Sequence, residues 1–243
     1  MNLGKTSNPA FTDFFWDDAQ SNSKKMSVSG IIIKTLICIF IIACITVFIW
    51  YYFSNGNNIK WFVTGGILGS IIISVIISVR KNWAPFLVPL YAITKGCFIG
   101  GITSFAKAKF PDLPYQAIGV TIITFFVMLL LYQTRIIVVT KKLRSIIIVA
   151  CSTIFLTYII SWILSFFGIR SFIWGTSWFA IVFNVVAAVF ASLSLLLDFD
   201  YIERKKNKAP KSKEWLATWG LLVTIIWLYV EILRLMRKLS IKF

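Results

Sequence analysis

Three carboxylates lie inside or directly after long apolar stretches near the end of the chain, where ionised groups are rare. Asp198 and Asp200 follow the apolar run that ends at Leu197, and Glu231 lies within Trp-Leu-Tyr-Val-Glu-Ile-Leu at residues 227–233. Two carboxylates that face one another at low dielectric constant cannot both ionise cheaply, so one of them keeps its proton at low pH. Such a pair could bind a hard cation, or open a path for one, at higher pH. Oxygen ligands without histidine or thiolate favour calcium over a transition metal.

The same residues also have a structural interpretation. Asp198 and Asp200 could begin a solvated connection, and Glu231 could be neutralised by Arg234, which lies three residues later on the same helix face. Two basic residues are candidate counter-ions: Arg80, and Lys95 in the middle of an apolar stretch. A charge at bilayer depth costs about 2.5–3.5 kcal/mol on insertion scales, so Lys95 needs an acidic partner or a water-filled cavity.

The residue inventory argues against enzymatic chemistry. The chain has no histidine, which is the commonest general base and transition-metal ligand, and its four cysteines form no C-x-x-C motif. An intramembrane aspartyl protease would need paired aspartates in characteristic motifs that this sequence lacks. We therefore expect no enzyme activity, no catalytic residue, no cofactor and no bound metal.

The composition is that of a membrane protein. Hydrophobic residues make up 58% of the 243 residues and charged residues 14%, whereas a soluble domain carries about 25% charged residues. The net charge of +16 comes from bases in short clusters between apolar stretches. This distribution is typical of contact with anionic lipid headgroups, so we expect the lipid bilayer as a partner and no nucleic acid.

Seven apolar segments are long enough to cross a hydrocarbon core of about 30 Å as helices. The sequence therefore predicts an all-α polytopic membrane protein, with a polar tail at residues 1–27 and a seven-helix transmembrane domain at residues 28–243. The segments are residues 31–53, 61–79, 84–106, 115–132, 143–167, 172–197 and 215–236.

Basic residues are unevenly divided between the two ends of these segments. Most lie before the first segment or in the connections after the second, fourth and sixth, including six between residues 204 and 213. The positive-inside rule therefore predicts a cytoplasmic N-terminus. The last segment can either span, which places the C-terminus outside, or re-enter with its basic tail inside.

Four strings of residues occur in a characteristic order and spacing. They are Ser-Asn-Pro-Ala-Phe at 7–11, a run from Trp83 through Leu-Tyr-Ala at 90–92 to Gly96 and Gly100, Leu-Leu-Asp-Phe-Asp-Tyr-Ile-Glu at 196–203, and Trp-Leu-Tyr-Val-Glu-Ile-Leu-Arg-Leu at 227–235. Together they resemble the Bax inhibitor-1 family, most closely its bacterial YccA-like branch. The resemblance implies two three-helix layers around a central C-terminal helix.

The resemblance also implies a pH-sensitive cation leak, chiefly for calcium, that two acidic residues on the last two helices control. Asp198 matches the family's acidic position in the sixth helix, and Glu231 matches the aspartate of a Leu-Tyr-Leu-Asp-like stretch in the seventh. Glu in place of Asp keeps the charge and lengthens the reach. Lys95 stands where relatives often carry Glu, and its positive charge would weaken cation passage.

We therefore expect a pH-sensitive calcium leak channel of the bacterial inner membrane. Protonation of an Asp198–Glu231 pair would gate it, with Asp200 nearby and Lys95 or Arg80 as counter-ions. The alternative is a non-conducting regulator that interacts with a membrane protease or with other membrane proteins. The acidic and aromatic residues of the polar N-terminal tail favour this alternative.

Overall fold

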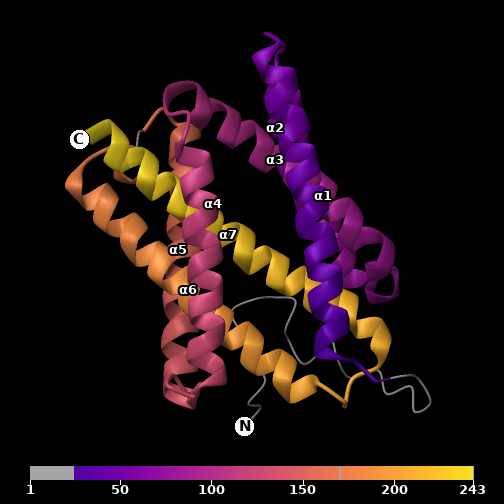
Figure 1. Cartoon of the computed structure of the whole chain (residues 1–243). Coiled ribbons are helices and arrows are strands. Elements are labelled where there is room, and N and C mark those ends of the chain that lie inside the picture. Colours follow the sequence, from indigo (N-terminus) through magenta and orange to yellow (C-terminus); the bar gives the residue numbers. More distant parts are fainter. Residues whose placement is uncertain (1–24, 170, 243) are drawn as a thin grey trace. The chain divides into compact units, whose positions relative to one another are not determined.

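The computed structural model describes residues 25–169 and 171–242, and these residues form seven α-helices with short connections (Figure 1). Each helix is long and apolar enough to cross a membrane, so the predicted all-α class is confirmed. Residues 1–24 of the expected tail lie outside the described residues. The helices are α1 (Val28–Ser54), α2 (Lys60–Val79), α3 (Ala84–Lys109), α4 (Leu113–Gln133), α5 (Lys141–Phe166), α6 (Trp178–Lys205) and α7 (Glu214–Lys242).

Large apolar side chains are exposed along these helices. Phe40 of α1 is 70% exposed and Phe86 of α3 is 83% exposed. In α4, only 11% of the most apolar 18-residue window is buried. Exposure of so much apolar surface to water is unfavourable, whereas contact of the same surface with lipid tails is not. The helices are therefore built for a hydrocarbon surrounding.

Helix α6 differs most from its predicted bounds. The sequence predicts a helix over 172–197, but residues Phe172–Trp174 form a short 3₁₀-helix and α6 begins only at Trp178. Ser177 explains the delay, because its hydroxyl accepts a hydrogen bond from the Ala180 amide at 3.4 Å and so caps the helix. At the other end α6 continues through the acidic residues to Lys205.

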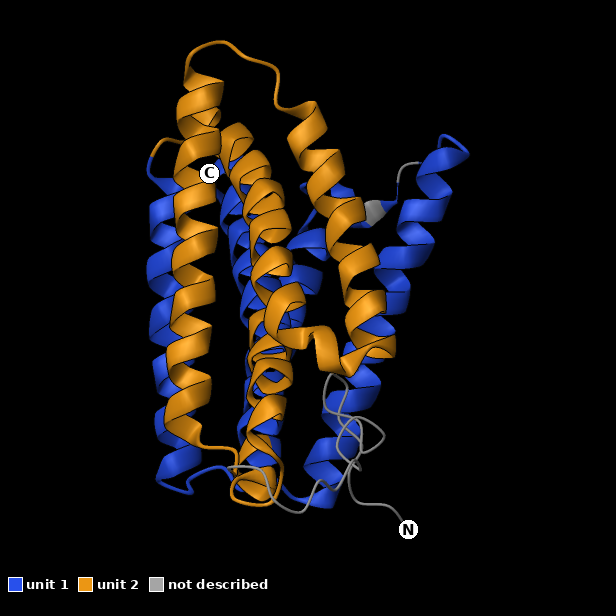
Figure 2. Cartoon of the chain, turned by 90° about the vertical axis from the view of Figure 1, so that its right-hand side faces the viewer, with its two compact units in different colours: residues 1–8, 112–201, 223–243 blue, residues 9–111, 202–222 orange. Residues whose placement is uncertain are grey.

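The chain divides into two compact units (Figure 2). Unit 2 contains α1, α2, α3 and residues 202–222, which include the end of α6 and the start of α7. Unit 1 contains α4, α5, α6 as far as Tyr201, and α7 from Val223 onward. Each unit thus has three helices and a part of α7, as the expected grouping into two sets of three requires. Helix α7 is also the most buried, with 83% of its window inside the protein.

Glycines allow the helices of unit 2 to approach closely. Gly96 and Gly100 of α3 lie against Ile45 and Ile49 of α1. A Cβ at Gly66 of α2 would lie only 2.7 Å from the Phe98 backbone nitrogen of α3. In lipid the hydrophobic effect does not drive helices together, so this close van der Waals contact is a main source of stability.

In unit 2, Glu214 at the start of α7 joins that helix to α1. Its fully buried carboxylate accepts hydrogen bonds from the Ser27 amide at 3.0 Å and from the Ser27 hydroxyl at 3.1 Å, and it forms an ion pair with Lys34. The Lys34 ammonium also lies 5.5 Å from the centre of the Trp215 ring. We call these contacts the Glu214 clamp.

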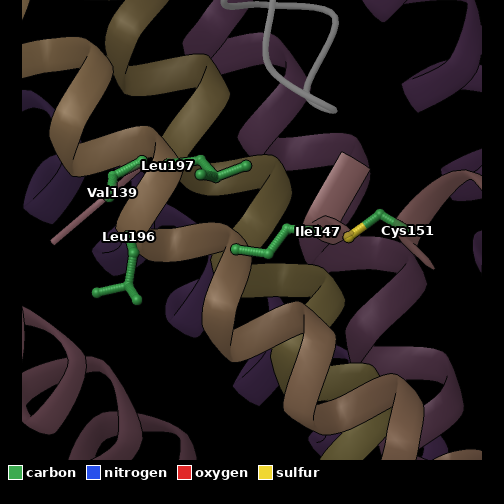
Figure 3. Close-up of a cluster of buried hydrophobic side chains, with 5 residues drawn as sticks. All are labelled: Val139, Ile147, Cys151, Leu196 and Leu197. Carbon is green, nitrogen blue, oxygen red and sulfur yellow. The ribbon is translucent and has the colours of Figure 1, made fainter. Parts of the chain in front are cut away.

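Unit 1 has a separate apolar core. Val139, before α5, packs with Ile147 and Cys151 of α5 and with Leu196 and Leu197 of α6 (Figure 3). Trp227 of α7 packs against this group. These contacts fix α6 just before its acidic residues, and they therefore position the candidate site.

Gly66 and its neighbour Gly65 provide a matched test of the close contact in unit 2. Gly66→Ala should destabilise the protein by about 1–3 kcal/mol, because the new methyl group meets immobile backbone atoms. Gly65 has open space around its Cβ position, so Gly65→Ala should leave stability unchanged or raise it by about 0.5 kcal/mol. Thermal unfolding in detergent measures both, and equal effects of the two variants would contradict the packing.

Candidate functional site

Asp198 and Asp200 lie in the continuing α6 helix rather than in a connection. Asp198 is 1% exposed and Asp200 is 9% exposed. The interpretation that these residues begin a solvated loop is therefore wrong, because α6 extends to Lys205. Two residues of helix correspond to a rotation of about 200°, so the two carboxylates leave α6 in nearly opposite directions.

Asp200 forms an ion pair with Arg144 of α5. Arg144 lies in the first turn of α5, where the Thr140 hydroxyl caps the helix by accepting a bond from the Leu143 amide at 3.2 Å. Arg144 is itself only 9% exposed. Removing one member of a buried pair leaves an uncompensated charge, which is strongly destabilising. A proton on Asp200 would weaken this link between α5 and α6.

Glu231 lies at the meeting point of three helices of unit 1. Its carboxylate is fully buried and accepts hydrogen bonds from Tyr158 of α5 at 2.8 Å and from Asn184 of α6 at 3.0 Å. The indole nitrogen of Trp227, one turn earlier on α7, donates to the other carboxylate oxygen at 3.1 Å. Both oxygens are thus bound by groups fixed in the fold.

Arg234 supplies the local charge that the sequence predicts. Its guanidinium lies 3.5 Å from the Glu231 carboxylate and 4.7 Å from the centre of the Tyr158 ring. It also lies 5.6 Å from the ring of Trp174. The predicted neutralisation of Glu231 by Arg234 is therefore present, but it is only one of several contacts.

Lys238 completes the same group of polar residues, which we call the Glu231 network. Its ammonium donates to the backbone oxygens of Ile173 at 2.6 Å and Ala180 at 3.2 Å, and to the side-chain oxygen of Asn184. These three acceptors match the three hydrogens of a lysine ammonium. The network thus links α7 to the start of α6 and to the segment before it.

The structure does not bring Asp198 and Glu231 together. Glu231 bonds to Asn184, and Asp198 follows Asn184 by fourteen residues on the same helix. At 1.5 Å per residue this separation is about 21 Å. The two carboxylates therefore do not form the expected pair. Asp198 lies near the C-terminal end of α6, whereas Glu231 of α7 lies beside Asn184 near the N-terminal end of α6. Sequence alone cannot show this, because the register between two helices depends on how they pack.

The two expected counter-ions both belong to unit 2. Lys95 of α3 is half-buried, and its ammonium lies 5.5 Å from the ring centres of both Tyr91 and Phe98. Arg80 is exposed at the end of α2. Among the described residues of unit 2, neither forms an ion pair with a carboxylate. Aromatic faces, rather than an acidic partner, accompany the Lys95 charge.

Sequence reasoning missed several residues of the site. Arg144 and Lys238 entered the prediction only among the basic residues counted for the membrane orientation of the chain. Tyr158 and Asn184 were not predicted as site residues. The signal for Asn184 was available, because it is the one amide side chain within the apolar run at residues 178–197. A polar side chain at bilayer depth needs a partner for the same reason as a charge.

Tyr158→Phe tests the Glu231 network. The substitution removes a hydroxyl that donates to a buried carboxylate, so we expect a loss of about 2 kcal/mol in the free energy of unfolding. Tyr229→Phe is the matched control, because the Tyr229 hydroxyl makes no hydrogen bond to another described residue. Thermal or denaturant unfolding in detergent should show a clearly larger loss for Tyr158→Phe, and equal losses would contradict the network.

Comparison with known proteins agrees with this architecture. A family model described as Bax inhibitor 1 like matches residues 8–241, nearly the whole chain. No curated protein and no solved structure gives a significant match. Seven membrane-length helices and this match lead to the same conclusion: the chain belongs to the Bax inhibitor 1 like family of membrane proteins.

Proposed function

We propose that this protein is a pH-sensitive cation leak, that calcium is a cation it passes, and that buried carboxylates of α6 control it. The observation that carries the proposal is the burial of Asp198 and Asp200 near the end of α6, with Asp200 paired to Arg144 of α5. Membership in the Bax inhibitor 1 like family supports the proposal.

The proposed control is electrostatic. Arg144 pairs with Asp200, and Asp198 leaves α6 in another direction, so two buried carboxylates lie within two residues of one another on this helix. Ionised carboxylates attract a hard cation, and protonated ones do not. Cation entry should therefore rise as the pH rises through the range in which these groups lose their protons. The proposal assigns the control to Asp198 and Asp200 and not to Glu231, because hydrogen-bond donors and the Arg234 guanidinium already surround the Glu231 carboxylate.

The proposal includes a location. The long apolar helices require a membrane, and the resemblance to a bacterial branch of the family supports the inner membrane of a bacterium. The concentration of bases before α1 and between α6 and α7 supports a cytoplasmic N-terminus.

Calcium entry into liposomes that contain the purified full chain tests the mechanism. Wild-type protein should admit more calcium at the higher of two pH values taken on either side of neutrality. Asp198→Asn and Asp200→Asn should abolish this difference, because an amide has no proton to lose. Asp198→Glu keeps an ionisable group and should retain the pH dependence.

Glu203→Gln is the matched control on the same helix. Glu203 has a side chain that is 52% exposed and pairs with Lys206 at the surface, so its replacement should leave calcium entry unchanged. Full pH dependence in both asparagine variants would exclude control by these carboxylates. Absence of calcium entry at either pH would overturn the leak and favour a non-conducting regulator of other membrane proteins.

A further inference from the structure

The connection between α6 and α7 is strongly basic. Residues 203–213, which comprise the end of α6 and the connection, contain six lysine or arginine residues and one acid, Glu203. Lys208 and Lys211 are exposed, and Lys206 is half-exposed beside Glu203. Lys25, just before α1, is also exposed. We call these four lysines the basic patch; all of them belong to unit 2.

Backbone hydrogen bonds hold this connection against the start of α1. The Met26 amide donates to the Ala209 oxygen at 2.9 Å, and the Asn207 amide donates to the Met26 oxygen at 3.2 Å. Lys25 and Pro210 form an antiparallel bridge at the same place. Asn207 has a φ of 61°, a left-handed conformation that asparagine adopts readily after a helix end. The connection is therefore a folded element with fixed neighbours.

The Glu214 clamp fixes the patch from the side of α7. Glu214 follows the connection directly, and its carboxylate binds the N-terminal part of α1 through the N-cap residue Ser27 and through Lys34. An added Cβ at Gly30 would lie 2.5 Å from this carboxylate, so α1 and the start of α7 are in close contact. Both helices are membrane-length spans. The exposed lysines must therefore lie where these spans leave the hydrocarbon.

This position determines which anion the patch meets. The connection between the end of α6 and the start of α7 is only eight residues long, residues 206–213. Such a short connection cannot carry its lysines far from the membrane surface. A Debye length of about 8 Å at physiological ionic strength keeps them within reach of headgroup phosphates. Clusters of four to eight bases next to a span are typical of anionic lipid binding.

We infer that the basic patch binds the headgroups of anionic phospholipids in the membrane that holds the protein. The lysine ammonium groups would contact the lipid phosphates, and the Glu214 clamp would keep the patch at the surface. The inference concerns unit 2 alone and does not depend on the proposed cation leak.

Retention of lipid by the detergent-solubilised full chain tests the inference. Phosphatidylglycerol is the anionic probe and phosphatidylcholine the zwitterionic reference, and native mass spectrometry counts the molecules bound. Wild-type protein should retain phosphatidylglycerol preferentially. The triple variant Lys206→Gln, Lys208→Gln, Lys211→Gln should bind it at least about tenfold more weakly, since each base near the surface contributes about fivefold. Salt at about 1 M should reduce wild-type binding similarly.

Two further variants separate the patch from general charge and from misfolding. Arginine at the same three positions keeps the charge and should retain the lipid. Glutamine at Lys60, Lys107 and Lys109, which lie at the other ends of α2 and α3, removes equal charge and should leave retention close to that of wild type. Equal losses in the two glutamine triples, or unchanged retention in the patch triple, would overturn the inference.

Discussion

A charge buried in the protein is stable only where another group compensates it, and this requirement determines the polar contacts within both units. In unit 2, the buried Glu214 is matched by Lys34 and by the N-cap residue Ser27 of α1. In unit 1, Asp200 is matched by Arg144, and Glu231 by Arg234 together with neutral donors. The first of these pairs joins the first and last helices, and the second joins the consecutive helices α5 and α6. They therefore specify which helices pack together, which uniform apolar surfaces in lipid cannot do.

Close backbone packing provides the attraction that these polar contacts direct. Gly66, Gly96 and Gly100 let α1, α2 and α3 approach until backbone atoms and branched side chains touch. The core of unit 1 relies instead on aliphatic side chains of α5 and α6, with Trp227 against them. The two units thus reach stable packing by different routes, and α7 contributes residues to both.

The separation of the acidic residues has a functional consequence. Glu231 receives hydrogen bonds from α5, α6 and its own helix, so its charge is compensated by groups with little freedom to move. Asp200 forms an ion pair with the Arg144 guanidinium of α5, and Asp198 leaves α6 on a different side. A proton on Asp200 would weaken a contact between α5 and α6 at the Asp198–Asp200 end of α6. For this reason the proposed control of conductance is assigned to that end.

The sequence by itself determined the number of helices and most of their bounds, and it offered the local contact of Arg234 with Glu231 as one of two interpretations. These features depend on apolar length and on spacing within a single helix, which can be read from neighbouring residues. It could not determine that Glu231 meets Asn184, forty-seven residues away, rather than Asp198. That contact depends on the rotation and register of α6 against α7, and the burial of Asp200 beside Arg144 depends likewise on α5. Only tertiary packing decides such partners, because many rotations of apolar helices satisfy the same hydrophobic pattern.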